Sequence, residues 1–78
     1  MNWKKTLKKK DEFINKLLKE GIFLYLKEFG ETYDYELAQH FNITIQKVLA
    51  LCCILVIEGR IEKKVGISKR KYFKVIDK

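Results

Sequence analysis

Apolar side chains recur at helical spacing through the first third of the chain. The pattern lies between Asp11 and Phe29 and comprises Phe13, Ile14, Leu17, Leu18, Ile22, Tyr25, Leu26 and Phe29. It predicts an amphipathic helix, capped at its start by the Asp11 carboxylate and ended by Gly30 in a left-handed conformation. Trp3 and Leu7 lie on the same stripe, so the first ten residues are either a helical extension or a basic arm.

Two shorter helical segments follow in the middle of the chain. The predicted order is an edge strand at 31–33, a helix at 35–41 capped by Asp34, a turn at Asn42 and Ile43, and a helix at 45–58 capped by Thr44 and stopped by Gly59. The first of these helices has on one side Leu37, Ala38 and Phe41. In the second, a rotation of about 100° per residue gathers a core stripe of Val48, Leu51, Cys52 and Leu55.

The hydrophobic period changes after Gly59. Residues 61–65 and 70–76 have the pattern of two β-strands, and the glycine-containing segment 66–69 joins them as a hairpin. The chain has no repeat, no proline and no low-complexity linker, so we expect a single domain over residues 1–78. Its expected parts are an N-terminal arm or helix extension at 1–10, a helical core at 11–59 and a β-hairpin at 60–76.

The segment from Tyr35 to Leu51 resembles the helix-turn-helix of bacterial and archaeal regulators of the MarR and ArsR types. The residues that carry the similarity are Leu37, Ala38, Ile43 and Thr44, continued into the hairpin by Leu55, Glu58, Gly59 and Ile61. The resemblance implies an α+β winged helix-turn-helix with three helices and a C-terminal β-hairpin wing, its helix-turn-helix spanning 35–58. It also implies a small regulator of archaea or archaeal viruses that binds DNA as a homodimer.

Positive charge is concentrated at the two ends of the chain. The net charge is +7, and residues 1–10 hold five lysines and no acidic residue. Residues 11–58 hold eight acidic against four basic residues, whereas residues 59–78 hold eight basic against two acidic. Two basic ends on a small domain favour a polyanionic partner, and double-stranded DNA is the partner that fits the predicted fold.

The candidate DNA-binding residues come from three segments. The start of the third helix would enter the major groove, while the hairpin and the N-terminal segment would contact phosphates. The candidates in the helix are Thr44, Gln46 and Lys47. Those in the hairpin are Lys63, Lys64, Lys69, Arg70 and Lys71, with further charge on Arg60 and Lys74. Those in the N-terminal segment are Lys4, Lys5, Lys8 and Lys9.

The face of the third helix opposite its core stripe is short of residues that read base edges. Beyond Gln46 it holds Ala50, Cys53 and Ile57. Either the protein binds DNA mainly through wing and arm, or this face is buried against another protein. A homodimer formed through the first helix would reconcile the two. A winged-helix protein-interaction module in a larger complex and an RNA- or ribosome-binding winged helix stay open as alternatives.

The sequence offers no catalytic or metal-binding pattern. Cys52 and Cys53 are adjacent and His40 is the only histidine, so neither a disulfide framework nor a zinc site of about four ligands is expected. No nucleophile–base constellation, phosphate-cradling glycine loop or paired-carboxylate motif is present. We therefore expect no enzymatic activity, no cofactor, no metal and no small-molecule substrate.

Hydropathy and aromatic residues give two further expectations. The longest apolar run, residues 48–57, is shorter than the roughly 18 residues that span a membrane, and the N-terminus does not have the form of a secretory signal. We expect a protein of the cytoplasm, or of the host cytoplasm if the chain is viral, with no membrane partner. The aromatic residues expected in the core are Phe23, Tyr25, Phe29, Phe41 and Phe73. Those that are candidates to face nucleic acid are Tyr33, Tyr35 and Tyr72.

Overall fold

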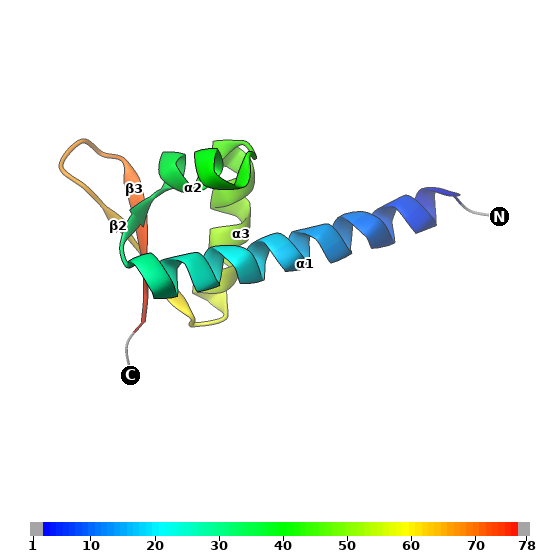
Figure 1. Cartoon of the computed structure of the whole chain (residues 1–78), viewed down its shortest axis with the longest axis horizontal. Coiled ribbons are helices and arrows are strands. Elements are labelled where there is room, and N and C mark those ends of the chain that lie inside the picture. The colour runs from blue at the N-terminus through cyan, green and yellow to red at the C-terminus, as the bar shows by residue number, and fades with distance from the viewer. Residues whose placement is uncertain (1–2, 77–78) are drawn as a thin grey trace.

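The computed structural model describes the backbone of residues 3–76 and the side chains of residues 12–76. Along the chain lie α1 (Trp3–Phe29), β1 (Thr32–Tyr33), α2 (Asp34–Phe41), α3 (Ile45–Ile57), β2 (Ile61–Val65) and β3 (Lys71–Val75) (Figure 1). The helices pack with a three-stranded antiparallel sheet whose strand order is β1-β3-β2. The predicted α+β winged-helix layout is therefore confirmed.

The first helix starts earlier than its apolar pattern indicated. Asp11 lies inside α1, so the prediction that it caps the helix is wrong, and the first ten residues continue the helix from Trp3 onward. The segment before Asp11 is rich in lysine and lacks glycine and proline, so nothing in its helix propensity stops α1 there. At the other end the prediction is confirmed. Gly30 has a φ of 82°, and its N–H donates to the Leu26 carbonyl at 2.8 Å.

The ends of the two shorter helices are fixed by local hydrogen bonds. Thr44 caps α3 as predicted, because its Oγ1 accepts the N–H of Lys47 at 3.1 Å. Asp34 differs from prediction. It is the first residue of α2 rather than its cap, the cap position being Tyr33, and its carboxylate accepts the N–H of Tyr35 at 2.7 Å. An acidic group in this first turn also complements the partial positive charge at the start of the helix.

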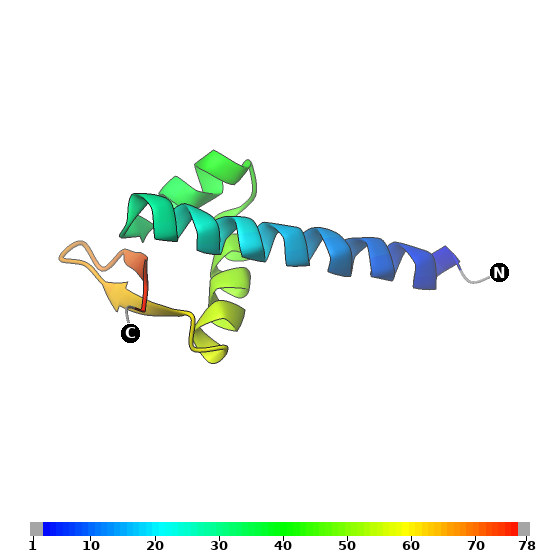
Figure 2. The ribbon, with the colours of Figure 1, turned by 60° about the horizontal axis from the view of Figure 1, so that its bottom comes forward.

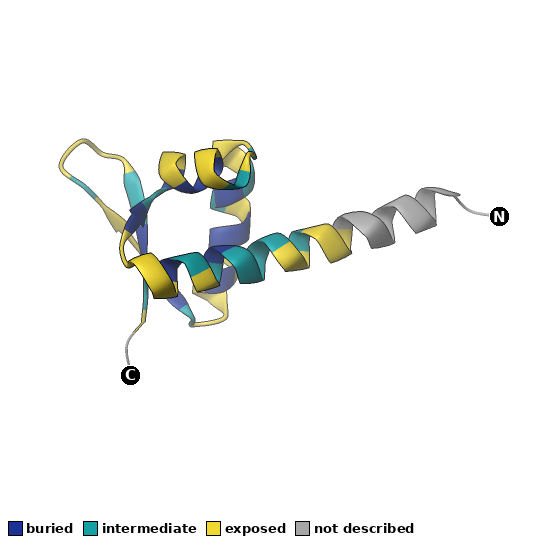
Figure 3. Ribbon diagram, in the orientation of Figure 1, coloured by how far each residue is buried: buried dark blue, intermediate teal, exposed yellow. Residues whose placement is uncertain are grey.

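The core lies where the second half of α1 meets the other elements. Its buried hydrophobic residues are Ile22, Leu26, Leu37, Ala38, Val48, Leu51, Cys52, Leu55, Ile61 and Phe73. Figure 3 shows buried positions in dark blue on α1, on α3 and on the strands. The four predicted core positions of α3 are all among them. Burial raises the pKa of the Cys52 thiol to about 12, so this cysteine is a neutral core residue, whereas Cys53 is exposed.

Close packing between α1 and α2 depends on a glycine. A Cβ atom at Gly21 would lie 3.1 Å from Cε1 of Phe41, which is tighter than an ordinary contact. Phe41 in turn packs edge-on against Tyr25, with the ring centroids 6.0 Å apart. The missing side chain at Gly21 therefore lets the end of α2 approach α1, a role that the sequence alone does not assign.

The first half of α1 projects away from the rest of the molecule (Figures 1 and 2). The side chains of Phe13 and Ile14 are exposed there, as is that of Leu17 just past the middle of the helix. Phe29, expected in the core, is also exposed by 69%, because it occupies the last turn of α1, where its ring packs on that of Tyr25, a partly buried residue at the margin of the core. Within residues 3–76 no single helix is long and apolar enough to cross a membrane, and α2 with α3 reaches that length and composition only as a pair bent by 109°.

Strand register divides the β2–β3 hairpin into two faces. The inner face turns toward the helices and consists of Ile61, Lys63, Val65, Lys71, Phe73 and Val75. The outer face consists of Glu62, Lys64, Tyr72 and Lys74, with Tyr33 of β1 paired beside Tyr72. Because side chains alternate along a strand, a shift of one residue would exchange the two faces. Burial of Ile61 and Phe73 fixes the register and so decides which lysines lie on the inner face, beside α3.

Candidate nucleic-acid interface

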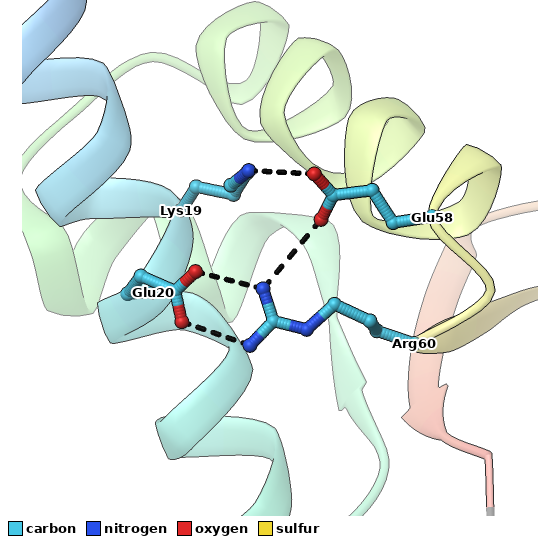
Figure 4. Close-up of polar contacts among 4 residues, drawn as sticks. All are labelled: Lys19, Glu20, Glu58 and Arg60. Atoms are coloured by element: carbon cyan, nitrogen blue, oxygen red, sulfur yellow. Dashed lines mark hydrogen bonds and ion pairs between the residues drawn. The ribbon is translucent and has the colours of Figure 1, made fainter.

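Four charged side chains join α1 to the start of the hairpin (Figure 4). Arg60 donates two hydrogen bonds to the Glu20 carboxylate, at 2.7 and 2.8 Å, and its guanidinium lies 4.0 Å from the centre of the Phe23 ring. Lys19 bonds Glu58 at 2.8 Å, and Arg60 approaches the same carboxylate at 3.5 Å. Arg60 is therefore a structural residue at the base of the hairpin, and it does not belong with the cations of the wing.

These ion pairs make the stability of the fold depend on pH. The hydrogen bond from Arg60 lowers the pKa of Glu20, and the hydrogen bond from Lys19 lowers the pKa of Glu58. A carboxyl group whose pKa is lowered by folding stabilises the protein above its unfolded pKa, and the contribution is lost as pH falls. We expect the midpoint of thermal unfolding to drop as the pH is lowered from about 7 to about 3.

The control for this prediction is the double variant Glu20→Gln, Glu58→Gln. It removes both titrating groups, so its unfolding midpoint should be lower than that of the parent at neutral pH and should change less on acidification. An equally steep decline in the variant would show that other carboxyl groups cause the pH dependence.

Two of the three candidate residues, Gln46 and Lys47, lie in the first turn of α3, and Thr44 is the cap residue directly before it. Gln46 is exposed and Lys47 is half-buried. Thr44 is exposed as well; its oxygen accepts the capping bond from Lys47, and its hydroxyl can still donate its proton to another group. Gln46 is thus the one residue of the three that offers an exposed side-chain amide to a base edge.

Two lysines of the wing stand beside α3. Lys63 and Lys71, on the inner face of the hairpin, border a hollow whose other walls are Phe73 and three residues of α3, namely Leu49, Cys53 and Val56. The sequence predicted both the basic hairpin and the apolar face of the helix. Only the register of the strands shows that these two lysines flank that apolar face.

The other candidate cations are differently placed. Lys64 lies on the outer face, with its Nζ 3.8 Å from the Glu62 carboxylate, so it does not accompany Lys63 and Lys71. The Arg70 guanidinium lies 5.1 Å from the centre of the Tyr35 ring, and Lys69 is exposed in the turn. The side chains of Lys4, Lys5, Lys8 and Lys9 lie outside the described residues, although their backbone belongs to α1.

Lys69 adopts a left-handed conformation, with a φ of 63°. This backbone conformation costs an L residue roughly 1–2 kcal/mol, which glycine avoids. Glycine also raises the conformational entropy of the unfolded chain, and this offsets part of the gain. Lys69→Gly should therefore stabilise the fold by about 0.5–1 kcal/mol in denaturant unfolding. Lys69→Ala removes the same charge but keeps the strained backbone, so it should give no such gain. Equal stabilisation by both variants would assign the effect to charge.

Comparison with protein-family models, with curated proteins and with solved structures gives no match to this chain. The functional assignment therefore depends on the geometry of the chain itself. Among the residues that the structure describes, no three His, Cys, Asp or Glu side chains are grouped as metal ligands would be. What the geometry offers is two cationic side chains beside a helix face, and a separate aromatic group.

The aromatic group consists of the three tyrosines named from the sequence. Tyr33 and Tyr35 have ring centroids 5.6 Å apart and planes inclined by 22°, and Tyr33 lies 5.5 Å from Tyr72. Their residue type made them candidates, but their gathering needs the pairing of β1 with β3 and the position of α2. The sequence carries no local signal for it.

The exposed face of α3 is apolar along most of its length. Ile57 is exposed by 79% and Ile54 by 44%, and Ala50 and Cys53 are exposed between the first turn and these residues. An apolar surface of this kind favours either thymine methyl groups in a DNA groove or the surface of another protein.

Proposed function

We propose that this protein binds double-stranded DNA and acts as a transcriptional regulator, by binding rather than by catalysis. The observation that carries the proposal is the placement of Lys63 and Lys71 beside the exposed face of α3. A helix of this width fits the major groove, and cationic side chains next to it reach the phosphates that border the groove. Gln46 and Lys47, in the first turn, would make the contacts to bases.

The scarcity of polar side chains on α3 predicts modest sequence preference. Phosphate contacts position a protein on the duplex without reading sequence, and on α3 only Gln46 and Lys47 are proposed to read bases. Most of the binding free energy should then come from counterion release, which makes the affinity strongly dependent on salt.

A homodimer formed through α1 completes the proposal. Phe13, Leu17 and Leu24 are exposed by 63%, 57% and 59%, although all three are large and apolar. At helical spacing they lie near one line along α1, on the side opposite Ile22 and Leu26. Burial of this stripe against the same stripe of a second copy would remove it from water, and would pair two DNA-binding faces.

Fluorescence anisotropy with labelled random-sequence duplex DNA, at two salt concentrations, tests the proposal. Binding that weakens steeply with salt supports it, whereas absence of binding at low salt contradicts it. Competition with structured RNA belongs in the same experiment. Preference for the RNA would replace duplex DNA by RNA as the partner.

A second candidate function, protein–protein interaction, is favoured by the exposure of Ile57 and Ile54. If the exposed face of α3 is covered by another protein in a larger complex, Ile57→Ser should abolish that association. Under the DNA proposal Ile57 lies at the far end of α3 from Gln46, so the same variant should bind duplex DNA as the parent does.

A further inference from the structure

Tyr33 lies between two hollows near the tip of the hairpin. The first is lined by Tyr33, Tyr35, Ile45, Ser68 and Arg70, and so joins the starts of α2 and α3 to the hairpin turn. The second is lined by Tyr33, Tyr72, Glu31, Gly66 and Ile67. Both differ from the hollow beside α3 that holds Lys63 and Lys71. The DNA-binding surface proposed above does not account for them.

Two of the five residues that line the first hollow are aromatic. The rings of Tyr33 and Tyr35 are inclined by only 22°, and Tyr35 remains 40% exposed. Ile45, the first residue of α3, is 38% exposed and adds an apolar surface facing the hollow. Flat apolar walls of this kind suit a planar ring system.

Tyr33 is held in place by the hairpin. A Cβ atom at Gly66 would lie 2.9 Å from the Tyr33 hydroxyl oxygen, so glycine at this position makes room for the ring. The N–H of Gly66 donates to the Arg70 carbonyl at 2.9 Å, which fixes the turn on which Arg70 stands. Tyr33 and Arg70 are thus positioned by the same few residues.

The charge beside the aromatic walls is positive. The Arg70 guanidinium lies 5.1 Å from the centre of the Tyr35 ring, and its N–H groups are donors that an anion can accept from. Lys64 pairs with Tyr72 in the strand register and lies on the same outer face, where Glu62 partly balances its charge. Of these two hollows, the second is lined by Glu31 and the first is not. An anionic ligand is therefore favoured at the first hollow.

We propose that Tyr33, Tyr35 and Arg70 bind unpaired bases of a single-stranded nucleic acid. Single strands are bound by aromatic rings that stack on the bases and by cations that accompany the phosphates, and the first hollow offers both. A duplex hides the faces of its bases, so it cannot use these rings in the same way. The proposal does not rest on duplex binding by α3, because it uses a separate set of side chains.

The test measures the affinity of the full chain for labelled oligothymidylate and oligouridylate at low salt. Loss of one stacking side chain costs a factor of about ten in affinity. Tyr35→Leu, which keeps an apolar side chain but removes the ring, should weaken single-strand binding by about tenfold and leave duplex binding within about twofold. Tyr35→Phe keeps the ring and should bind as the parent does. The oligonucleotide that the protein binds more tightly identifies DNA or RNA as the source of the bases.

Three results would overturn this inference. The first is no binding of either oligonucleotide at low salt. The second is an equal loss in Tyr35→Phe and Tyr35→Leu, which would assign the contact to the hydroxyl rather than to stacking. The third is an equal loss of duplex binding in Tyr35→Leu. Gly66→Ala, which displaces the Tyr33 ring, provides a second variant with its own expected loss of single-strand affinity. Circular dichroism confirms that each variant is folded.

Discussion

Replacing Lys63 and Lys71 together by alanine is expected to weaken duplex DNA binding by about 60-fold at about 0.1 M salt. Each phosphate contact contributes about 0.9 to the slope of log affinity against log salt, so two lost contacts lower the slope by about 1.8. The contribution of such contacts to affinity vanishes near about 1 M salt. Between about 1 M and about 0.1 M, which is one decade, a slope difference of about 1.8 gives the loss of about 60-fold. Anisotropy titrations over a range of salt concentrations give both quantities.

The hairpin supplies its own matched control for this prediction. Lys64→Ala with Lys74→Ala removes the same charge from the outer face of the same two strands. This control should change duplex affinity only slightly, through the reduced net charge of the protein. If both double variants lose affinity equally, the wing acts through overall charge and the placement of Lys63 and Lys71 beside α3 has no role.

Introducing a charge at Leu17 is expected to dissociate the proposed homodimer. The native protein should sediment at twice the 9.3 kDa mass of one chain. A glutamate at position 17 would be buried without a partner in the dimer, at a cost of roughly 3 kcal/mol or more, which raises the dissociation constant by about 100-fold or more. Analytical ultracentrifugation over a range of concentrations measures this change.

Two further variants separate the interface from charge effects. Leu17→Lys introduces the opposite charge at the same position and should dissociate the dimer as Leu17→Glu does. Lys16→Ala alters an exposed neighbour about 100° away on the helix and should leave the dimer intact. A native protein that sediments as a monomer at every concentration would remove α1 as an interface, and duplex binding would then have to be explained for a single copy.

If both predictions hold, the protein is a paired DNA-binding module whose affinity comes mainly from phosphates. The wing sets the affinity of each copy, and α1 sets the number of copies that bind together. The two effects are separable, because Lys63 and Lys71 belong to the hairpin while Leu17 belongs to α1. A single-strand site at Tyr35 would add a third property that neither variant affects.

The sequence by itself determined the order of the elements and the buried side of α3. Helices and strands follow from local periods of apolar residues, and residues such as Thr44, Gly30 and Gly59 mark helix ends through bonds to their own neighbours. The apolar stripe of α3 could be predicted because each residue of a helix is rotated by the same fixed angle from the one before it. The positions that share a face therefore follow from their spacing in the sequence. The prediction that Asp11 caps α1 also relied on local sequence, and it is wrong because a good capping residue also fits inside a helix when the preceding residues favour helix.

The tertiary structure decided which side chains share a surface. Arg60 looks like a wing cation in the sequence, yet Glu20, forty positions away, engages it. Lys63 and Lys64 are adjacent in sequence but lie on opposite faces of the hairpin, and burial of Phe73 sets which of them accompanies α3. Tyr33 and Tyr72 meet only through strand pairing. These contacts join distant parts of the chain, so they depend on register and packing, which local periodicity does not encode.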